Sequence, residues 1–555
     1  MSGAVLAAME LPLDLLLVHA DDQLPVLSST AEASSAAGQP PPNKVPVPRR
    51  LRHDSADPND LVQQRWGVIA PEGDRGTHLL SLIAPLAEHR SREQGGHPVR
   101  EYRVPPRMTE AEAIRWIGQV YWDEAVPEED LPKYLLVLGE PHEVPLALQQ
   151  MLAGQAFAGR LGFPDDAGYR GYVAKVLARE QAPSSRRAPA RALFHAVNDG
   201  TRATGIGRKV LLDPIVTSAR TGHLAGKLRA SEVVEIGEGR FVDPHSFLGA
   251  MARPEPGVML TVSHGCGAPR SGWASEAEQR AIQGAMSFGR GPRLDAAQVA
   301  NRPFLPGGLW VFMACFSAAV PRESAYLPWL TRLREQGLYG GDLQNLLAGL
   351  AGPGQDPFLA ALPTAVLASH EGPLGVIGHV DLAWTYSFQD IDDGTARDRP
   401  SRFRGVVEAA LSGARMGVAH NELVRFFPAA NIELSTLHGD ESPAGAARRA
   451  HLWMKRNDLC GHILLGDPAA RVVEPAPAVA ARPHLQGAAA WLGFGGAESG
   501  APSAELARKQ EIVLAILRGE PVAQVAHRFG VSAERATALH DAYHAAGLRA
   551  LADMG

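Results

Sequence analysis

Short apolar runs that end abruptly at small or polar residues recur along this chain of 555 residues. Such runs are typical of buried parallel strands, and patterns with helical spacing lie between them, as at 78–89. Strands that alternate with helices form parallel sheets, so the pattern predicts an α/β fold. The stretch 151–180 is expected to be mostly helical. The predicted strands are 65–71, 134–139, 191–197, 257–264, 308–315 and 375–384.

Breaker-rich stretches divide the chain. Residues 21–60 and 181–189 are rich in Ser, Ala, Pro and charge and lack periodicity, which is typical of linkers. We therefore expect five parts. They are an N-terminal strand and flexible linker (1–60), a first α/β subdomain (61–185), a second α/β subdomain (186–480), a Gly/Ala-rich linker (481–502) and an all-α module (503–555).

Two of the predicted strands end at residues that carry chemistry. His264 and Gly265 follow the strand that begins at Gly257, and Cys315 follows the strand that begins at Gly308. Ligand and catalytic groups gather at the carboxyl ends of parallel strands. A thiol needs a base to become a nucleophilic thiolate, and an imidazole on the adjacent strand can serve. The N–H groups of Gly265 and Cys315 are candidates for an oxyanion hole, because glycine lets an oxygen approach closely.

This pair resembles the His-Gly and Ala-Cys-x-Ser elements of the caspase-like cysteine peptidases, the superfamily that includes gingipains, separases, metacaspases and bacterial CHAT proteases. His264 and Cys315 are 51 residues apart, close to the interval of about fifty in caspases. The Gln-Ala-Cys-x-Gly form of true caspases is replaced by Met313–Ser317, which is nearer the gingipain-like and CHAT-like forms. Cys266 and the C-terminal extension depart from the family pattern.

The resemblance covers about 61–473 and implies a caspase-like parallel-sheet sandwich of two α/β subdomains, of which only the second (186–480) is catalytic. It implies a thiol protease that cleaves protein substrates without a metal or an organic cofactor. The gingipain-like layout favours cleavage after Arg, with a carboxylate in the pocket for the residue before the cut. We expect this substrate pocket to be lined by Asp199, Trp384, Met313 and Val262.

Three of the candidate residues, Cys315, Trp384 and Asp199, also have a structural interpretation. A lone Cys after an apolar run is often a small buried hydrophobe, Trp384 can be a core residue, and Asp199 can belong to an Asn-Asp-Gly turn. Cys266 competes as the nucleophile, but it lies on the same loop as the proposed base, which is a poor geometry for attack. The order and spacing of His264 and Cys315 favour the catalytic interpretation.

Composition and the apolar pattern bear on the location of the protein and on its possible partners. No apolar run approaches the roughly 18 residues of a membrane span, and no basic region precedes an apolar one at the N-terminus, so we expect a cytoplasmic protein without membrane association. The three cysteines have no paired spacing, no Cys/His set has zinc-finger spacing, and the net charge of −6 gives no general attraction to nucleic acid.

The last part of the chain, 503–555, has a helix-turn-helix pattern. It contains six basic and six acidic residues, so it carries no net charge that would favour DNA. The pattern still leaves an alternative function, a DNA-binding regulator in which the caspase-like domain is a sensor or scaffold. For the protease, we expect a latent precursor of a bacterial signalling, stress or antiviral defence pathway, with an activating protease or regulatory protein as partner. Paired arginines in the two linkers make Arg50 and Arg187 candidate processing sites.

Overall fold

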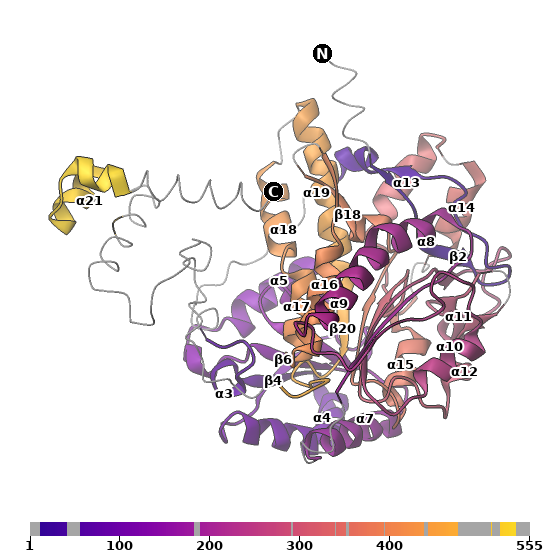
Figure 1. Ribbon diagram of the computed structural model, residues 1–555, viewed down its shortest axis with the longest axis horizontal. Coiled ribbons are helices and arrows are strands. Elements are labelled where there is room, and N and C mark those ends of the chain that lie inside the picture. The colour runs from indigo at the N-terminus through magenta and orange to yellow at the C-terminus, as the bar shows by residue number, and fades with distance from the viewer. Residues whose placement is uncertain are drawn as a thin grey trace. The chain divides into compact units, whose positions relative to one another are not determined.

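The computed structural model describes residues 11–40, 56–182, 189–289, 292–338, 340–350, 355–392, 395–437, 442–475, 512 and 522–539 (Figure 1). The chain divides into two compact units, 1–475 and 476–555. Both expected α/β subdomains belong to the first unit, and the expected processing sites Arg50 and Arg187 lie outside the described residues.

The first unit is built on one ten-stranded sheet. Its eight inner strands are buried along their whole length because helices cover the sheet, which explains their continuous apolar runs, whereas the two edge strands are only partly buried. In spatial order the strands are β5 (Arg100–Val104), β4 (Trp66–Pro71), β6 (Tyr134–Leu138), β7 (Phe157–Leu161), β20 (His462–Gly466), β17 (Gly375–His379), β14 (Leu309–Met313), β10 (Gly257–Val262), β8 (Arg191–Ala196) and β9 (Val233–Glu235).

The two α/β subdomains are halves of this single sheet, and β20 joins them. In the described part of the chain, β20 pairs parallel with β7 and antiparallel with β17, while the other neighbouring strands of the sheet pair in parallel. The strands of the two halves therefore run in opposite directions. Within the second half, β10, β14 and β17 are parallel to one another, so their carboxyl ends meet at one edge of the sheet, and this edge carries His264 and Cys315.

Two rows of helices pack along the sheet (Figure 1). The first row consists of α4 (Gly73–Glu93), α7 (Asp166–Glu180), α15 (Ala361–Ala368) and α12 (Ala296–Val299). The second consists of α9 (Asp213–Leu224), α16 (Pro400–Leu411), α17 (Met416–Val424) and α19 (Pro443–Gly461). In α4 the buried side chains Leu79, Leu82, Ile83 and Leu86 recur at helical spacing, so one face of the helix packs inward.

The structure departs from two expectations about local structure. The stretch 151–180 was expected to be mostly helical, and α7 forms its second half, but its first half contains strand β7, whose apolar run is too short to distinguish from a helix by pattern. Residues 21–40 were expected to be linker, but they contain β3 (Ala31–Glu32) and the 3₁₀ helix η1 (Ala33–Gly38), which packs on α19. The small side chains of Ala33 and Ala36 are buried there, which permits close packing without a strong hydrophobic signal.

A buried ion-pair network ties the first half of the sheet to the end of β20. Arg90 of α4 is fully buried, and its guanidinium contacts Glu180 of α7 at 2.7 Å and Asp467 at 2.7 Å. His89, Glu93 and Glu180 bring potential metal ligands within 4.8 Å of one another. However, Arg90 contacts both of these glutamates, so the cluster is an ion-pair network.

We expect Glu180→Gln to destabilise the protein by roughly 3 kcal/mol, because it leaves the buried Arg90 guanidinium with less negative charge around it. Burial by itself would raise the pKa of Glu180, but Arg90 and His89 more than offset this and lower it to about 2. The stabilisation is therefore complete above the ordinary value of 4.5 and is lost as the pH falls towards 2. Thermal unfolding of wild type and variant between pH 7 and pH 3 measures both effects.

The control is Glu276→Gln, which removes an exposed ion pair with Arg280. Exposed pairs contribute about 0–1 kcal/mol, so this variant should unfold within a few degrees of wild type. Equal midpoints for the Glu180 and Glu276 variants at pH 7 would contradict the role given to the buried network.

The described part of the second unit is helical. Helix α21 (Val522–Phe529) is followed by Gly530 in the left-handed conformation, with φ of 58°, and by helical residues 533–539. Val525, Ala526 and Ala536 are buried together with Ile512. Across both units, the helices among the described residues are too short or too polar to cross a bilayer.

Candidate active site

The loops that carry His264 and Cys315 lie side by side. Strands β10 and β14 are parallel neighbours with Val262 opposite Met313, so His264 and Cys315 each lie two residues beyond a paired position. The Ser263 amide donates to the Met313 carbonyl at 3.1 Å, which continues the pairing towards the site. The structure therefore brings the two predicted residues to the same edge of the sheet.

The two amides predicted to form an oxyanion hole converge on one oxygen. The N–H groups of Gly265 and Cys315, hereafter the amide pair, donate to the carbonyl of Leu16 at 3.0 and 3.3 Å. The backbones of residues 265 and 315 lie close together, which only a glycine at 265 permits, because a Cβ atom there would lie 2.0 Å from the Cys315 carbonyl oxygen. A carbonyl oxygen held by two amides has the arrangement that stabilises an oxyanion during acyl transfer.

The His264 ring is buried and held from one side. Its Nε2 is 2.8 Å from Thr201 Oγ1 and 3.6 Å from Asp199 Oδ2. Asp199 Oδ1 accepts from the Thr201 amide and the Thr204 hydroxyl, which fixes the carboxylate. Burial lowers the pKa of His264, and the Asp199 carboxylate acts in the opposite sense.

The Cys315 thiol is fully buried, and its Sγ accepts from the Ala383 amide at 3.1 Å. Burial raises the pKa of this thiol well above its ordinary value, and the Ala383 amide opposes the shift. Burial is the main cause of both shifts, and it favours the neutral form of each group.

No protein-family model matches the chain, and no curated protein matches it. Among solved structures it is similar to one described as a protease, with a TM-score of 0.42 and 11% identity over 77% of this chain and 82% of that chain. It is also similar to the Arg specific cysteine proteinase gingipain R (TM-score 0.38, 11% identity, 74% and 78% covered) and to the complex of Porphyromonas gingivalis RgpB pro- and mature domains (0.37, 12%, 73% and 79%).

The loop 315–318 has a strained backbone and is held by hydrogen bonds to residues at the end of β17. Phe316 has a φ of 54°, which is uncommon for a residue with a side chain. Its amide donates to the Asp381 carbonyl at 3.0 Å, and the Ala318 amide donates to the His379 carbonyl at 3.0 Å. The end of β17 thus fixes the turn that presents Cys315. This assigns His379 and Asp381, two buried residues at a strand end, a supporting role through their backbone.

The four residues expected to line a substrate pocket have different surroundings. Asp199 lies beside His264, as described above, and borders a cavity of about 500 Å³ together with His264. Trp384 is fully buried against Tyr326 and Trp329, which matches its structural alternative as a core residue, although its backbone bridges to Leu15. Val262 and Met313 end their strands with buried side chains.

Cys266 has the surroundings of a core residue. It packs with Val18, Ala20 and Ala285, and its thiol contacts Gln23 at distances above 3.5 Å. Burial raises its pKa to about 11. Cys315 is equally buried, but it adjoins the amide pair and its Sγ accepts from the Ala383 amide at 3.1 Å, so its position favours it over Cys266 as the reactive cysteine.

Sequence reasoning missed three groups that contact the site. Thr201 lies two residues after Asp199 in a turn motif, so its position beside the strand end was a usable signal. The Ala383 amide and the Leu16 carbonyl are backbone groups, which any residue type supplies. No pattern of side chains can reveal them.

Proposed function

We propose that this chain is a cysteine peptidase with Cys315 as the nucleophile and His264 as the base and acid. The observation that carries the proposal is the convergence of the amide pair on a single carbonyl oxygen beside Cys315. A peptide bond bound with its oxygen there would lie next to Cys315, whose own amide is one of the two donors.

The residues suit both steps of such a reaction. The Cys315 sulfur attacks the carbonyl carbon, the oxygen becomes an oxyanion held by the amide pair, and His264 passes the thiol proton to the leaving amine. Water, deprotonated by the same imidazole, then hydrolyses the thioester and restores the thiol. His264 Nε2 faces Thr201 and Asp199, so Nδ1 is the ring nitrogen that takes the proton from the Cys315 thiol and gives it to the leaving amine. Asp199 is then a positioning residue that stabilises the imidazolium.

A cysteine-directed peptidyl ketone tests this proposal. The full-length protein is incubated with the probe for hours, because the covered thiol becomes accessible only by local opening. The probe should modify Cys315, and modification should disappear in Cys315→Ala and persist in Cys266→Ala. His264→Ala should slow it at least about tenfold at pH 7, because the thiolate is no longer formed by the imidazole. Modification of Cys266 with Cys315 untouched would contradict the proposal.

A further inference from the structure

The oxygen in the amide pair belongs to the chain itself. Leu16 lies in the segment Leu11–His19, hereafter the N-terminal segment, about 250 residues before the site in sequence. Its carbonyl accepts from Gly265 and Cys315 at 3.0 and 3.3 Å. A substrate carbonyl would need the same two donors, so the two cannot be bound together.

The backbone before Leu16 runs beside residues 383–385 as an added strand. The Leu16 amide donates to the Ala383 carbonyl at 3.0 Å, and Leu15 forms an antiparallel bridge with Trp384. Asp14 donates its amide to Thr385 Oγ1 and accepts from the Thr385 amide, each at 3.0 Å. Strand addition is a common way to bind an extended peptide, because backbone bonds hold it and the side chains alternate into different pockets.

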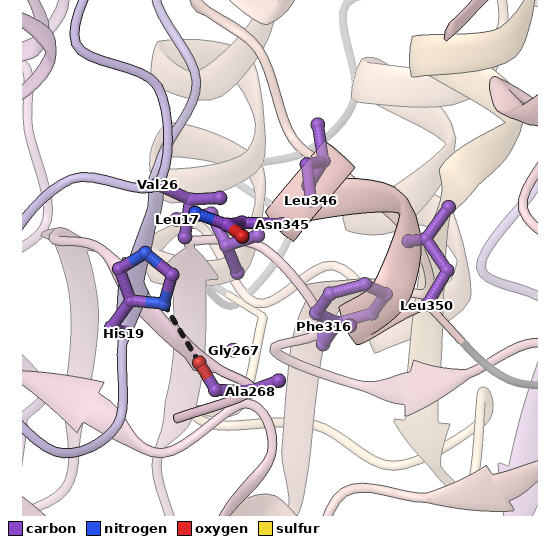
Figure 2. A pocket seen from close by; sticks show the side chains of 10 residues that line it. Leu17, His19, Val26, Gly267, Ala268, Phe316, Asn345, Leu346 and Leu350 are labelled. Carbon is purple, nitrogen blue, oxygen red and sulfur yellow. Dashed lines mark hydrogen bonds between the residues drawn. The ribbon is translucent and has the colours of Figure 1, made fainter. Parts of the chain in front are cut away.

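The backbone after Leu16 is held equally well. Strand β2 (Leu17–His19) pairs in parallel with β11 (Gly265–Gly267) directly after His264. Figure 2 shows Leu17 and His19 beside Val26, Ala268 and Phe316, around a cavity of only about 10 Å³. His19 Nδ1 lies 2.9 Å from the Ala268 carbonyl. The segment therefore crosses the site in an extended form and is bound on both sides of the Leu16–Leu17 peptide bond.

The side chains of the segment indicate what the site accepts. Leu16 has no exposed surface, so its apolar side chain is fully enclosed. Asp14, two residues earlier, pairs with Arg202 at 3.0 Å, and Arg202 borders the cavity that also contains His264. The carboxylate of Asp199, on which the expected preference for Arg rested, accepts through Oδ1 from Thr201 and Thr204, and its Oδ2 lies 3.6 Å from His264 Nε2.

We propose that the N-terminal segment occupies the substrate channel of this peptidase as a pseudosubstrate, and that it reports the substrate class. The channel takes extended peptides with an apolar residue before the cut and an acidic residue two positions earlier, which Arg202 recognises. The enzyme is latent while the segment is bound. This inference rests on the proposed peptidase function for its specificity, whereas the occupancy of the channel stands on the contacts alone.

The first test measures alkylation of Cys315 in the full-length protein by iodoacetamide, with peptide mapping. Leu16→Asp places a charge in an enclosed site, and Asp14→Arg sets two cations against each other, so each should release the segment and speed alkylation at least about tenfold. Leu224→Asp, at a leucine that is 88% exposed, should behave as wild type. The swap Asp14→Arg with Arg202→Asp should restore slow alkylation, which a general loss of packing would not allow.

Both variants should be shown to be folded by circular dichroism. If Cys315 in each of them is alkylated at the wild-type rate, the proposal that the segment occupies the channel is wrong. Faster alkylation without hydrolysis of any peptide would instead remove the peptidase function and leave the occupancy standing. The two proposals can therefore fail separately.

The second test compares peptide coumarin amides on the released Leu16→Asp enzyme. The sequence Leu-Asp-Leu-Leu before the coumarin should give a kcat/KM at least about tenfold above Leu-Asp-Leu-Arg, because an enclosed apolar pocket does not solvate a guanidinium. Replacing the Asp by Ala should cost about fivefold, as expected for a partly exposed ion pair, and Arg202→Ala should abolish that difference. Faster cleavage after Arg would overturn the substrate class.

Discussion

Cys315→Ala is expected to abolish peptide hydrolysis, with a loss in kcat of at least about 10⁴, because no other group in the site can form the thioester. His264→Ala should give a loss of similar size, since an uncovered thiol with an ordinary pKa is largely protonated at pH 7 and needs the imidazole to become a thiolate. The double variant should be hardly worse than either single one, because the two residues act as a unit. Steady-state hydrolysis of a coumarin peptide by the released Leu16→Asp enzyme measures all three.

The matched control is Cys266→Ala in the same background. Cys266 is also buried and lies two residues from His264, but it packs among apolar neighbours, so kcat should change by less than about twofold. Hydrolysis retained in His264→Ala, or lost in Cys266→Ala with the fold intact, would contradict the assignment of the dyad.

Gly265→Ala should remove most activity without touching either catalytic side chain. The new Cβ atom would meet the Cys315 carbonyl oxygen at 2.0 Å, a contact that only a backbone shift can relieve. That shift moves both amides of the pair, and the loss of one such donor alone typically costs 10² to 10³ in kcat. The probe should still modify Cys315 in this variant, more slowly, because the thiol and the imidazole remain.

Gly249→Ala is the control for a glycine substitution. Gly249 lies in helix α10 (Pro244–Met251), and a Cβ atom there would meet nothing within 4 Å. Alanine is the better helix former, so activity should be unchanged and stability should rise by about 0.5–1 kcal/mol. Full activity in Gly265→Ala would show that the amide pair does not hold the reacting oxygen.

Asp199 shows how much of the candidate site can be predicted from the sequence. Its place at a strand end predicted a position in the substrate pocket, and the structure places its carboxylate 3.6 Å from His264 Nε2. Its distance to a base or to a substrate side chain depends on the turn 198–201, in which Thr201 and Thr204 orient the carboxylate towards His264. Turn geometry of this kind follows from several local hydrogen bonds together, and a residue pattern does not resolve it.

The α/β class and the strand-end positions of His264 and Cys315 follow from the residue pattern, because apolar runs that end at reactive residues predict buried parallel strands whose carboxyl ends share one edge. That both halves share one sheet does not follow from the pattern, since the strand that joins them, β20, lies about 300 residues after its neighbour β7 in the sequence. The tertiary structure decided this, and it also decided what fills the site. The apolar pattern of 11–19 predicts a buried strand, but it does not name the partner of that strand, because the backbone hydrogen bonds that pair strands are the same for every residue type.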